Sequence, residues 1–66
     1  MKVLYPNLRA EMARKGMTQT DLGRILNIST VAVHMRLSGQ IQWRIEEIGK
    51  VLDFFGKDFD YLFKDE

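Results

Sequence analysis

Apolar residues recur three or four positions apart along most of this 66-residue chain, in short stretches separated by Gly, Asn and Ser. That spacing places them on one face of a helix, whereas a half-buried strand would alternate apolar and polar positions. Five such stretches follow one another without repeats or low-complexity segments. We therefore expect an all-α fold of five helices joined by short loops, in a single domain over residues 1–66.

The first helix is expected to open at Pro6 or Asn7, after a short apolar arm over residues 1–5. Pro suits the first position of a helix, and Asn is a good N-cap. Leu8 and Met12 lie four apart and share its inner face. Gly16 then ends the helix as a left-handed C-cap.

The second predicted helix begins at Thr18, with Asp21 three residues later in the position of a capping box. Gly23 lies inside it and costs about 1 kcal/mol relative to Ala, so we expect it to permit a close helix crossing. Asn27 ends the helix, because Asn tolerates the left-handed conformation of a tight turn. The buried face is expected to consist of Leu22, Ile25 and Leu26.

The third predicted helix begins after a Ser29 cap and runs to about Ser38. Its apolar positions are Val33 and Leu37 on the inner side, and Val31 and Met35 on the outer side. An exposed apolar ridge is typical of an interaction surface. The stretch 18–39 is therefore predicted to be a helix-turn-helix whose second helix faces a partner.

The fourth helix is expected between an Arg44 cap and Gly56, and a short fifth helix after Asp58. Trp43 would pack onto Ile48 across the cap. Glu46 and Glu47 would favour the positive end of the helix dipole. The expected core positions are Ile45, Ile48, Val51, Leu52 and Phe55 in the fourth helix, and Phe59, Leu62 and Phe63 in the fifth. Phe54, with Tyr61 or Phe63, is a candidate dimer contact.

Charge changes this picture more through its distribution than through its total of +1. Residues 1–44 carry a net charge of +5 and residues 45–66 a net charge of −4. Such asymmetry suits a polyanionic partner at one end, although chance clustering explains it as well. The candidate phosphate anchors are the basic side chains of Arg9, Arg14, Lys15, Arg36 and Arg44. We expect at least two of the five to be plain surface charges.

The composition argues against an enzyme or a metalloprotein. One His, no Cys and scattered carboxylates leave no catalytic set, no metal site and no expected cofactor. No apolar run is long enough to span a membrane, and the first residues do not form a signal peptide. We therefore expect a cytoplasmic protein.

Several short motifs together resemble the Cro/C1-type helix-turn-helix family of phage and bacterial repressors. The strongest are Thr-Gln-x-x-Leu-Gly from Thr18, Leu-Asn-Ile-Ser from Leu26, then Val33 and Gly39. The closing Phe-Asp-Tyr-Leu-Phe from Phe59 is similar to the last helix of the family. The resemblance extends over residues 7–63 and implies a five-helix, lambda-repressor-like DNA-binding domain with its helix-turn-helix at the second and third helices.

The resemblance implies a phage-type transcriptional regulator in a bacterial host cell. It would insert the helix at about 29–38 into the major groove. It would bind a palindromic operator as a dimer, with half-sites about 34 Å apart. The expected dimer includes a weak one and one that forms only on DNA. The residues expected to contact bases are Ser29, Thr30, Val31, His34 and Met35. Those expected to contact the DNA backbone are Arg14, Lys15, Thr18, Gln19, Arg36, Ser38, Gln40 and Arg44.

Two departures from the family pattern keep a second function open. The family often pairs an Arg and a Glu at the positions of Met12 and Leu37, and an apolar pair replaces them here. Val31 and Met35 cannot make bidentate hydrogen bonds to bases, although they suit thymine methyl groups. The alternative is a protein-binding modulator, an anti-repressor, whose helix-turn-helix surface covers a repressor. A purely structural helical module is the least favoured reading.

Overall fold

Five helices make up the computed structural model, which describes residues 4–64, and no strand occurs in that range. Their bounds are α1 Pro6–Arg14, α2 Gln19–Leu26, α3 Thr30–Leu37, α4 Ile45–Phe55 and α5 Phe59–Leu62. The predicted all-α, five-helix fold is confirmed. The expected arm over residues 1–5 lies mostly outside the described residues.

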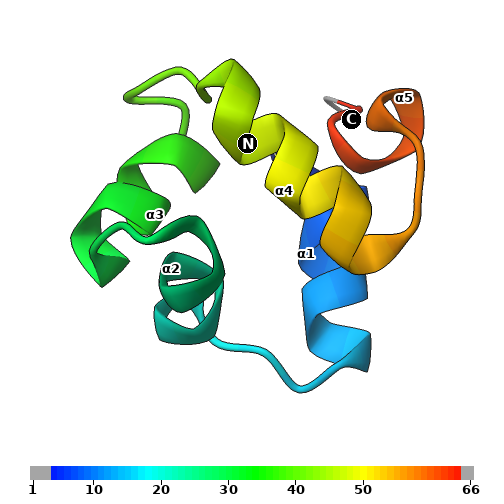
Figure 1. Ribbon diagram of the computed structural model, residues 1–66, viewed down its shortest axis with the longest axis horizontal. Coiled ribbons are helices and arrows are strands. Elements are labelled where there is room, and N and C mark those ends of the chain that lie inside the picture. Colours follow the sequence, from blue (N-terminus) through cyan, green and yellow to red (C-terminus); the bar gives the residue numbers. More distant parts are fainter. Residues whose placement is uncertain (1–3, 65–66) are drawn as a thin grey trace.

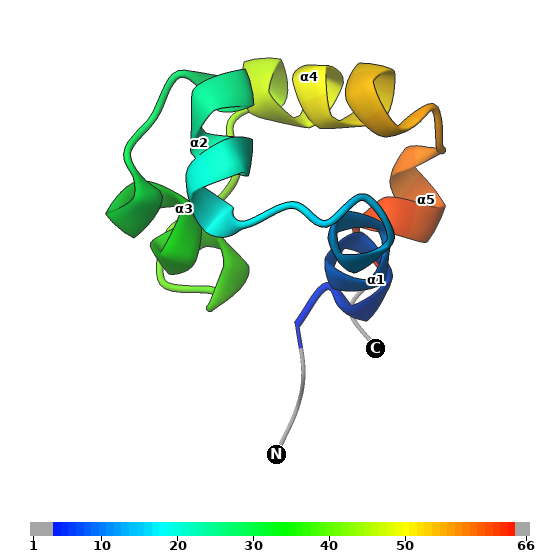
Figure 2. The same cartoon turned by 90° about the horizontal axis from the view of Figure 1, so that it is seen from below.

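The helices form two halves that α4 bridges. Helices α2 and α3 lie on one side, α1 and α5 on the other, and α4 runs across both (Figures 1 and 2). The closest packing is α2 on α3 and α1 on α5, and α4 touches α2 at one side and α5 at the other. The outer edge of the first half is therefore α3.

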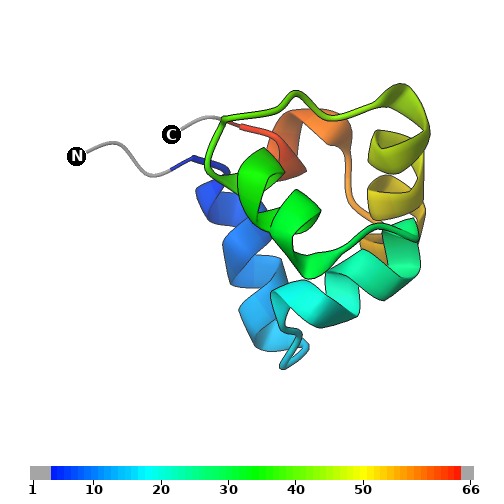
Figure 3. The same cartoon turned by 90° about the vertical axis from the view of Figure 1, so that its left-hand side faces the viewer.

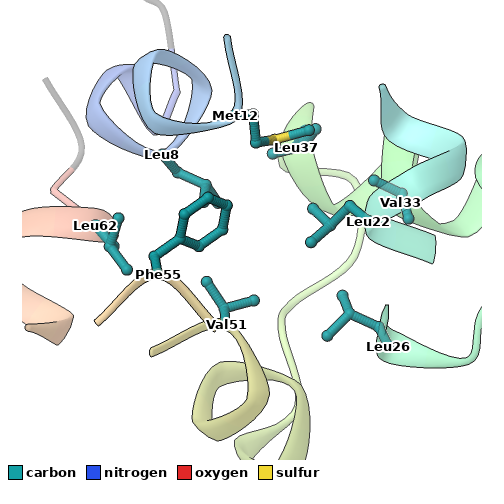
Figure 4. Close-up of a cluster of buried hydrophobic side chains, with 9 residues drawn as sticks. All are labelled: Leu8, Met12, Leu22, Leu26, Val33, Leu37, Val51, Phe55 and Leu62. Carbon is teal, nitrogen blue, oxygen red and sulfur yellow. The ribbon is translucent and has the colours of Figure 1, made fainter. Parts of the chain in front are cut away.

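The core lies between the two halves. Its nine buried apolar side chains are Leu8, Met12, Leu22, Leu26, Val33, Leu37, Val51, Phe55 and Leu62. Figure 4 shows Met12 from α1 lying beside Leu37 from α3, so the two positions predicted to hold an apolar pair are both inside the core. These chains come from all five helices, which fixes the positions of the helices relative to one another.

Helix α4 buries the predicted face at Val51 and Phe55 but not in its first turn. Ile45 is 83% exposed, although the spacing placed it in the core. Glu47, four residues before Val51, takes the inward position of the first turn, and Ile48 is only partly buried. Ile45 and Glu47 both satisfy helical spacing with Phe55, so the contacts with other helices decide which of them is buried.

Local signals place the helix ends as expected. Thr18 and Asp21 form the predicted capping box, with the Thr18 hydroxyl accepting from the Asp21 N–H at 3.2 Å. Asn27 takes the left-handed conformation with φ 59°, and Gly16 does so with φ 63°. The Ser29 hydroxyl accepts the Ala32 N–H at 3.1 Å and begins α3. The Thr18 and Ser29 hydroxyls thus satisfy backbone N–H groups that a helix start leaves free.

A second apolar cluster, made of aromatic rings, brings together Tyr5 before α1, Trp43 before α4 and Phe63 after α5. Trp43 packs edge to face on Tyr5 and on Phe63, with centroids 6.0 and 5.2 Å apart. Phe59 stacks on Phe63 at 5.2 Å but stays 48% exposed, so it does not pack into the core as predicted. Ile48 lines the same hollow as Trp43, which agrees with the predicted packing across the cap.

Candidate nucleic-acid interface

The candidate site is the outer face of α3, held at a fixed angle by the turn that precedes it. Three residues, 27–29, connect α2 to α3. The Ile28 N–H donates to the Gly23 carbonyl at 2.9 Å, which folds the chain back on α2. A Cβ at Gly23 would lie 2.6 Å from the Ile28 carbonyl oxygen and 3.5 Å from a Val33 methyl group. The close approach expected at this glycine is therefore to the turn first and to α3 second.

The residues predicted to contact bases are mostly on the free face of α3, which lies in front in Figure 3. Ser29, Thr30 and His34 are exposed, and Val31 is 67% exposed. Met35 is partly buried, and its carbonyl accepts the N–H groups of residues 40 and 41. The outer face of α3 thus presents the hydroxyl groups of Ser29 and Thr30 at its start, the apolar side chain of Val31 and the imidazole of His34.

The start of α2 lies near that face. Thr20 and Thr30 share a hydrogen bond between their hydroxyls at 2.9 Å, which ties the first turns of α2 and α3 together. Gln19 and Thr18 line a hollow with Arg9 and Leu37. Two helix starts are therefore brought to one side of the molecule, together with Thr18 and Gln19, two of the residues predicted for phosphate contacts.

The end of α3 adds further polar groups. The Gln40 amide donates to the Ser38 hydroxyl at 2.9 Å, and both side chains are exposed. Arg9 donates to the Leu37 carbonyl at 3.1 Å and to the Leu4 carbonyl at 3.0 Å. Arg9, one of the candidate phosphate anchors, therefore binds a carbonyl at the C-terminal end of α3, where its positive charge suits the helix dipole.

Arg36 is the clearest correction to the predicted site. It is only 7% exposed and pairs with Glu47 through Nε–Oε1 at 2.7 Å and Nη2–Oε2 at 3.0 Å. Its Nη1 donates to the Ala32 carbonyl at 3.0 Å. A guanidinium with these partners inside the domain is not a phosphate anchor, because breaking a buried pair is costly.

Glu47 has a larger role than compensation of the helix dipole. Its Oε1 also accepts the Arg44 N–H at 3.0 Å, so the same carboxylate caps α4 and binds Arg36. Burial acts to raise the pKa of Glu47, but the hydrogen bonds and charge of Arg36 and the Arg44 N–H outweigh it and lower that pKa. A Glu three residues after an N-cap is a capping signal, so the sequence held a sign of the second role.

Arg14 and Lys15 belong to the other half of the molecule. Arg14 pairs with Glu11, which also accepts the Tyr61 hydroxyl at 2.8 Å. The Lys15 ammonium lies 5.3 Å from the centre of the Phe54 ring. Arg14 and Lys15 were predicted to contact the DNA backbone. The structure places them in the α1–α5 half and not beside the outer face of α3. Arg44 is exposed at the start of α4.

The three candidate dimer contacts, Phe54, Tyr61 and Phe63, differ in exposure. Phe54 is 43% exposed on α4 and packs edge to face on Phe55, with centroids 5.0 Å apart. Tyr61 and Phe63 are partly buried, the first bonded to Glu11 and the second in the aromatic cluster. Phe54 is the one of the three that offers a large exposed apolar ring.

Comparison with known proteins assigns a family. Within residues 4–64 no helix has the length and apolar character needed to cross a membrane, and no three potential metal-ligating side chains cluster. Searches of curated proteins and of solved structures found no match. The model of the BetR domain matches residues 2–66, nearly the whole chain, whereas the resemblance drawn from the sequence was to the Cro/C1-type family. The chain therefore belongs to the BetR domain family.

Proposed function

We propose that this chain is a sequence-specific DNA-binding transcriptional regulator that places α3 in the major groove. The observation that carries the proposal is the α2–α3 unit: a three-residue turn, a close fit at Gly23, and an α3 whose outer side chains make few contacts within the domain. A helix with its side chains is about 10–12 Å across, and the major groove is about 12 Å wide. The finer assignment to a Cro/C1-like repressor is part of this proposal.

The polar groups around α3 support the same reading. Thr18, Gln19 and Gln40 flank the helix, and free N–H groups at helix starts suit phosphate contacts. Ser29, which is exposed at the cap, belongs to the same set. Positioning on the DNA would come from these groups and from Arg44.

Base recognition by this face would be modest. Val31 suits a thymine methyl group, and Thr30 and His34 offer hydrogen bonds, but no Arg, Asn or Gln on the outer face gives a bidentate contact. Specificity would then depend partly on the shape and deformability of the DNA. A dimer on a palindromic operator would double this limited readout, with half-sites about 34 Å apart.

The test is a selection of bound sequences from a random duplex library, followed by titration of the best sequence at several salt concentrations. We expect a palindromic preference and a linear fall of log affinity with log salt, with a slope of about −0.9 per phosphate contacted. Val31→Asp should abolish the preference, whereas Asp53→Asn, at an exposed position of α4, should not. A flat salt plot with no preference over random duplex refutes the proposal.

One observation favours a second candidate, an anti-repressor that covers a repressor protein. Val31 is 67% exposed and apolar, and it lies on the same face as the partly buried Met35. Such a surface suits a protein partner as well as a thymine methyl group. If Val31→Asp abolishes co-purification of a repressor while the wild-type chain shows no DNA preference, the second candidate replaces the first.

A further inference from the structure

We infer that the buried Arg36–Glu47 pair, together with the turn that precedes α3, fixes the direction in which α3 presents its outer face, so that both residues are positioning residues for recognition. The inference rests on the proposed function for its consequence on DNA, but its geometric content concerns α3 and α4 alone.

The pair joins two helices through one guanidinium and one carboxylate. Arg36 makes both nitrogen–oxygen contacts of a bidentate pair with Glu47, at 2.7 and 3.0 Å, and holds the carbonyl of Ala32 in its own helix at 3.0 Å. Glu47 in turn holds the Arg44 N–H at 3.0 Å, at the first turn of α4. The backbone of α3 is thereby tied to the start of α4 through directional bonds.

The other directional contacts of α3 hold it to α2 and α1: the three-residue turn, the Thr20–Thr30 hydrogen bond and the Arg9 bond to the Leu37 carbonyl. Val33 and Leu37 are fully or almost fully buried, but aliphatic contacts are not directional. Residues 38–44 connect α3 to α4, and all of them are exposed except Trp43, whose ring packs on Tyr5 and Phe63. A bidentate pair demands a defined angle and register between its partners. Arg36 and Glu47 therefore supply the directional link between the C-terminal half of α3 and the start of α4, whereas the turn holds the N-terminal end of α3 on α2.

The outer residues would move together if that angle changed. Arg36 follows Met35 directly and lies five residues after Val31, on the opposite side of the same eight-residue helix. A tilt of α3 about this point displaces Val31, Thr30 and His34 in concert. Contacts to base edges need accurate placement, whereas non-specific phosphate binding does not.

Net stability is a poor explanation of the pair. A buried ion pair is often replaced by apolar residues at no cost, while removal of one partner is strongly destabilising. The decisive variant is therefore the double substitution Arg36→Met with Glu47→Leu, which removes the pair without leaving a buried charge. The matched control is Arg14→Met with Glu11→Leu, which removes the corresponding pair in the α1–α5 half.

Three measurements separate positioning from a purely structural role. Urea unfolding gives the stability, residual dipolar couplings give the angle of α3 to α4, and titration gives affinities for the selected operator and for random duplex. We expect the Arg36/Glu47 double variant to remain folded, to show a changed or averaged α3 angle, and to bind the operator about tenfold less tightly. Its affinity for random duplex should stay unchanged, and so should the α3 angle and both DNA affinities of the control.

Each remaining outcome decides the matter. An unchanged α3 angle with full operator affinity overturns the inference, and so does a salt slope for random duplex that falls by about 1, since that identifies Arg36 as a phosphate contact. If the double variant does not fold, Glu47→Gln, which keeps an oxygen for the Arg44 N–H, provides the same comparison. If the wild-type chain shows no DNA preference, the proposed function fails, and the dipolar couplings alone test the positioning.

Discussion

The two buried glutamates of this domain hold its two halves in different ways. Glu47 faces Arg36, and the two side chains are 7% and 8% exposed. Glu11 accepts the Tyr61 hydroxyl, but its charged partner Arg14 is 64% exposed. The first contact is sealed from water on both sides and links α3 to α4. The second is open on one side and links α1 to α5.

The difference shows where the domain tolerates change. An exposed charge keeps its hydration when its partner is lost, whereas a buried one loses hydration and partner together. The half that carries α3 also holds the tight contact at Gly23, while Gly16, Gly49 and Gly56 have open space where a Cβ would go. The half that would meet a partner is thus the more narrowly specified one.

The largest effect should come from Glu47→Ala, which leaves Arg36 buried and unpaired. We expect it to lower the free energy of unfolding by about 3–5 kcal/mol, most of the stability of so small a domain. Urea denaturation at neutral pH measures it. Glu11→Ala should cost clearly less, because Arg14 remains hydrated. Equal losses in the two variants would abolish the distinction between the halves.

Gly23→Ala should have an intermediate effect, although Ala is the better helix former. The new Cβ would lie 2.6 Å from the Ile28 backbone oxygen, which cannot move as a flexible side chain does. We expect a net loss of about 1–3 kcal/mol from this overpacking. Gly49→Ala, at an exposed position of α4, is the matched control and should stabilise the domain by about 1 kcal/mol or less. A stabilised Gly23→Ala variant would show that the turn is not tightly constrained.

Tyr61→Phe should have the smallest effect, and acid should remove it. The Tyr61 hydrogen bond, followed by the charge of Arg14, lowers the pKa of Glu11 below 4.5 against the opposing effect of burial. A lowered folded-state pKa adds stability that is complete above the unfolded value and is lost as pH falls through the folded value. Thermal unfolding of wild type and variant should therefore differ at pH 7 and converge as pH falls below the unfolded value of about 4.3 and through the lower folded value. Parallel curves at every pH would contradict this account of Glu11.

The sequence predicted the parts of the fold that depend on neighbours along the chain. Thr18, Asn27 and Ser29 act within a few residues, so the caps and the turn were placed correctly. Val33 and Leu37 were assigned to the core by spacing alone, and the structure agrees. Local chemistry therefore determines most of the α2–α3 unit.

The errors concern residues whose environment is set by a distant helix. Charged side chains are mostly exposed, so Arg36 was assigned to the surface, and its partner Glu47 is on another helix. The pair with Arg36 turns Glu47 inward, and Ile45, two residues earlier in α4, then faces outward. Lys15 was likewise assigned by charge, and its aromatic neighbour Phe54 lies 39 positions away in the chain.

The double use of one carboxylate also bears on how the domain opens. Helix ends normally fray independently, each with its own small free energy. Here the oxygen that holds the first turn of α4 is the oxygen that holds Arg36 of α3. Fraying at the start of α4 would thus release α3, and the two would exchange their amide hydrogens with solvent as one cooperative unit.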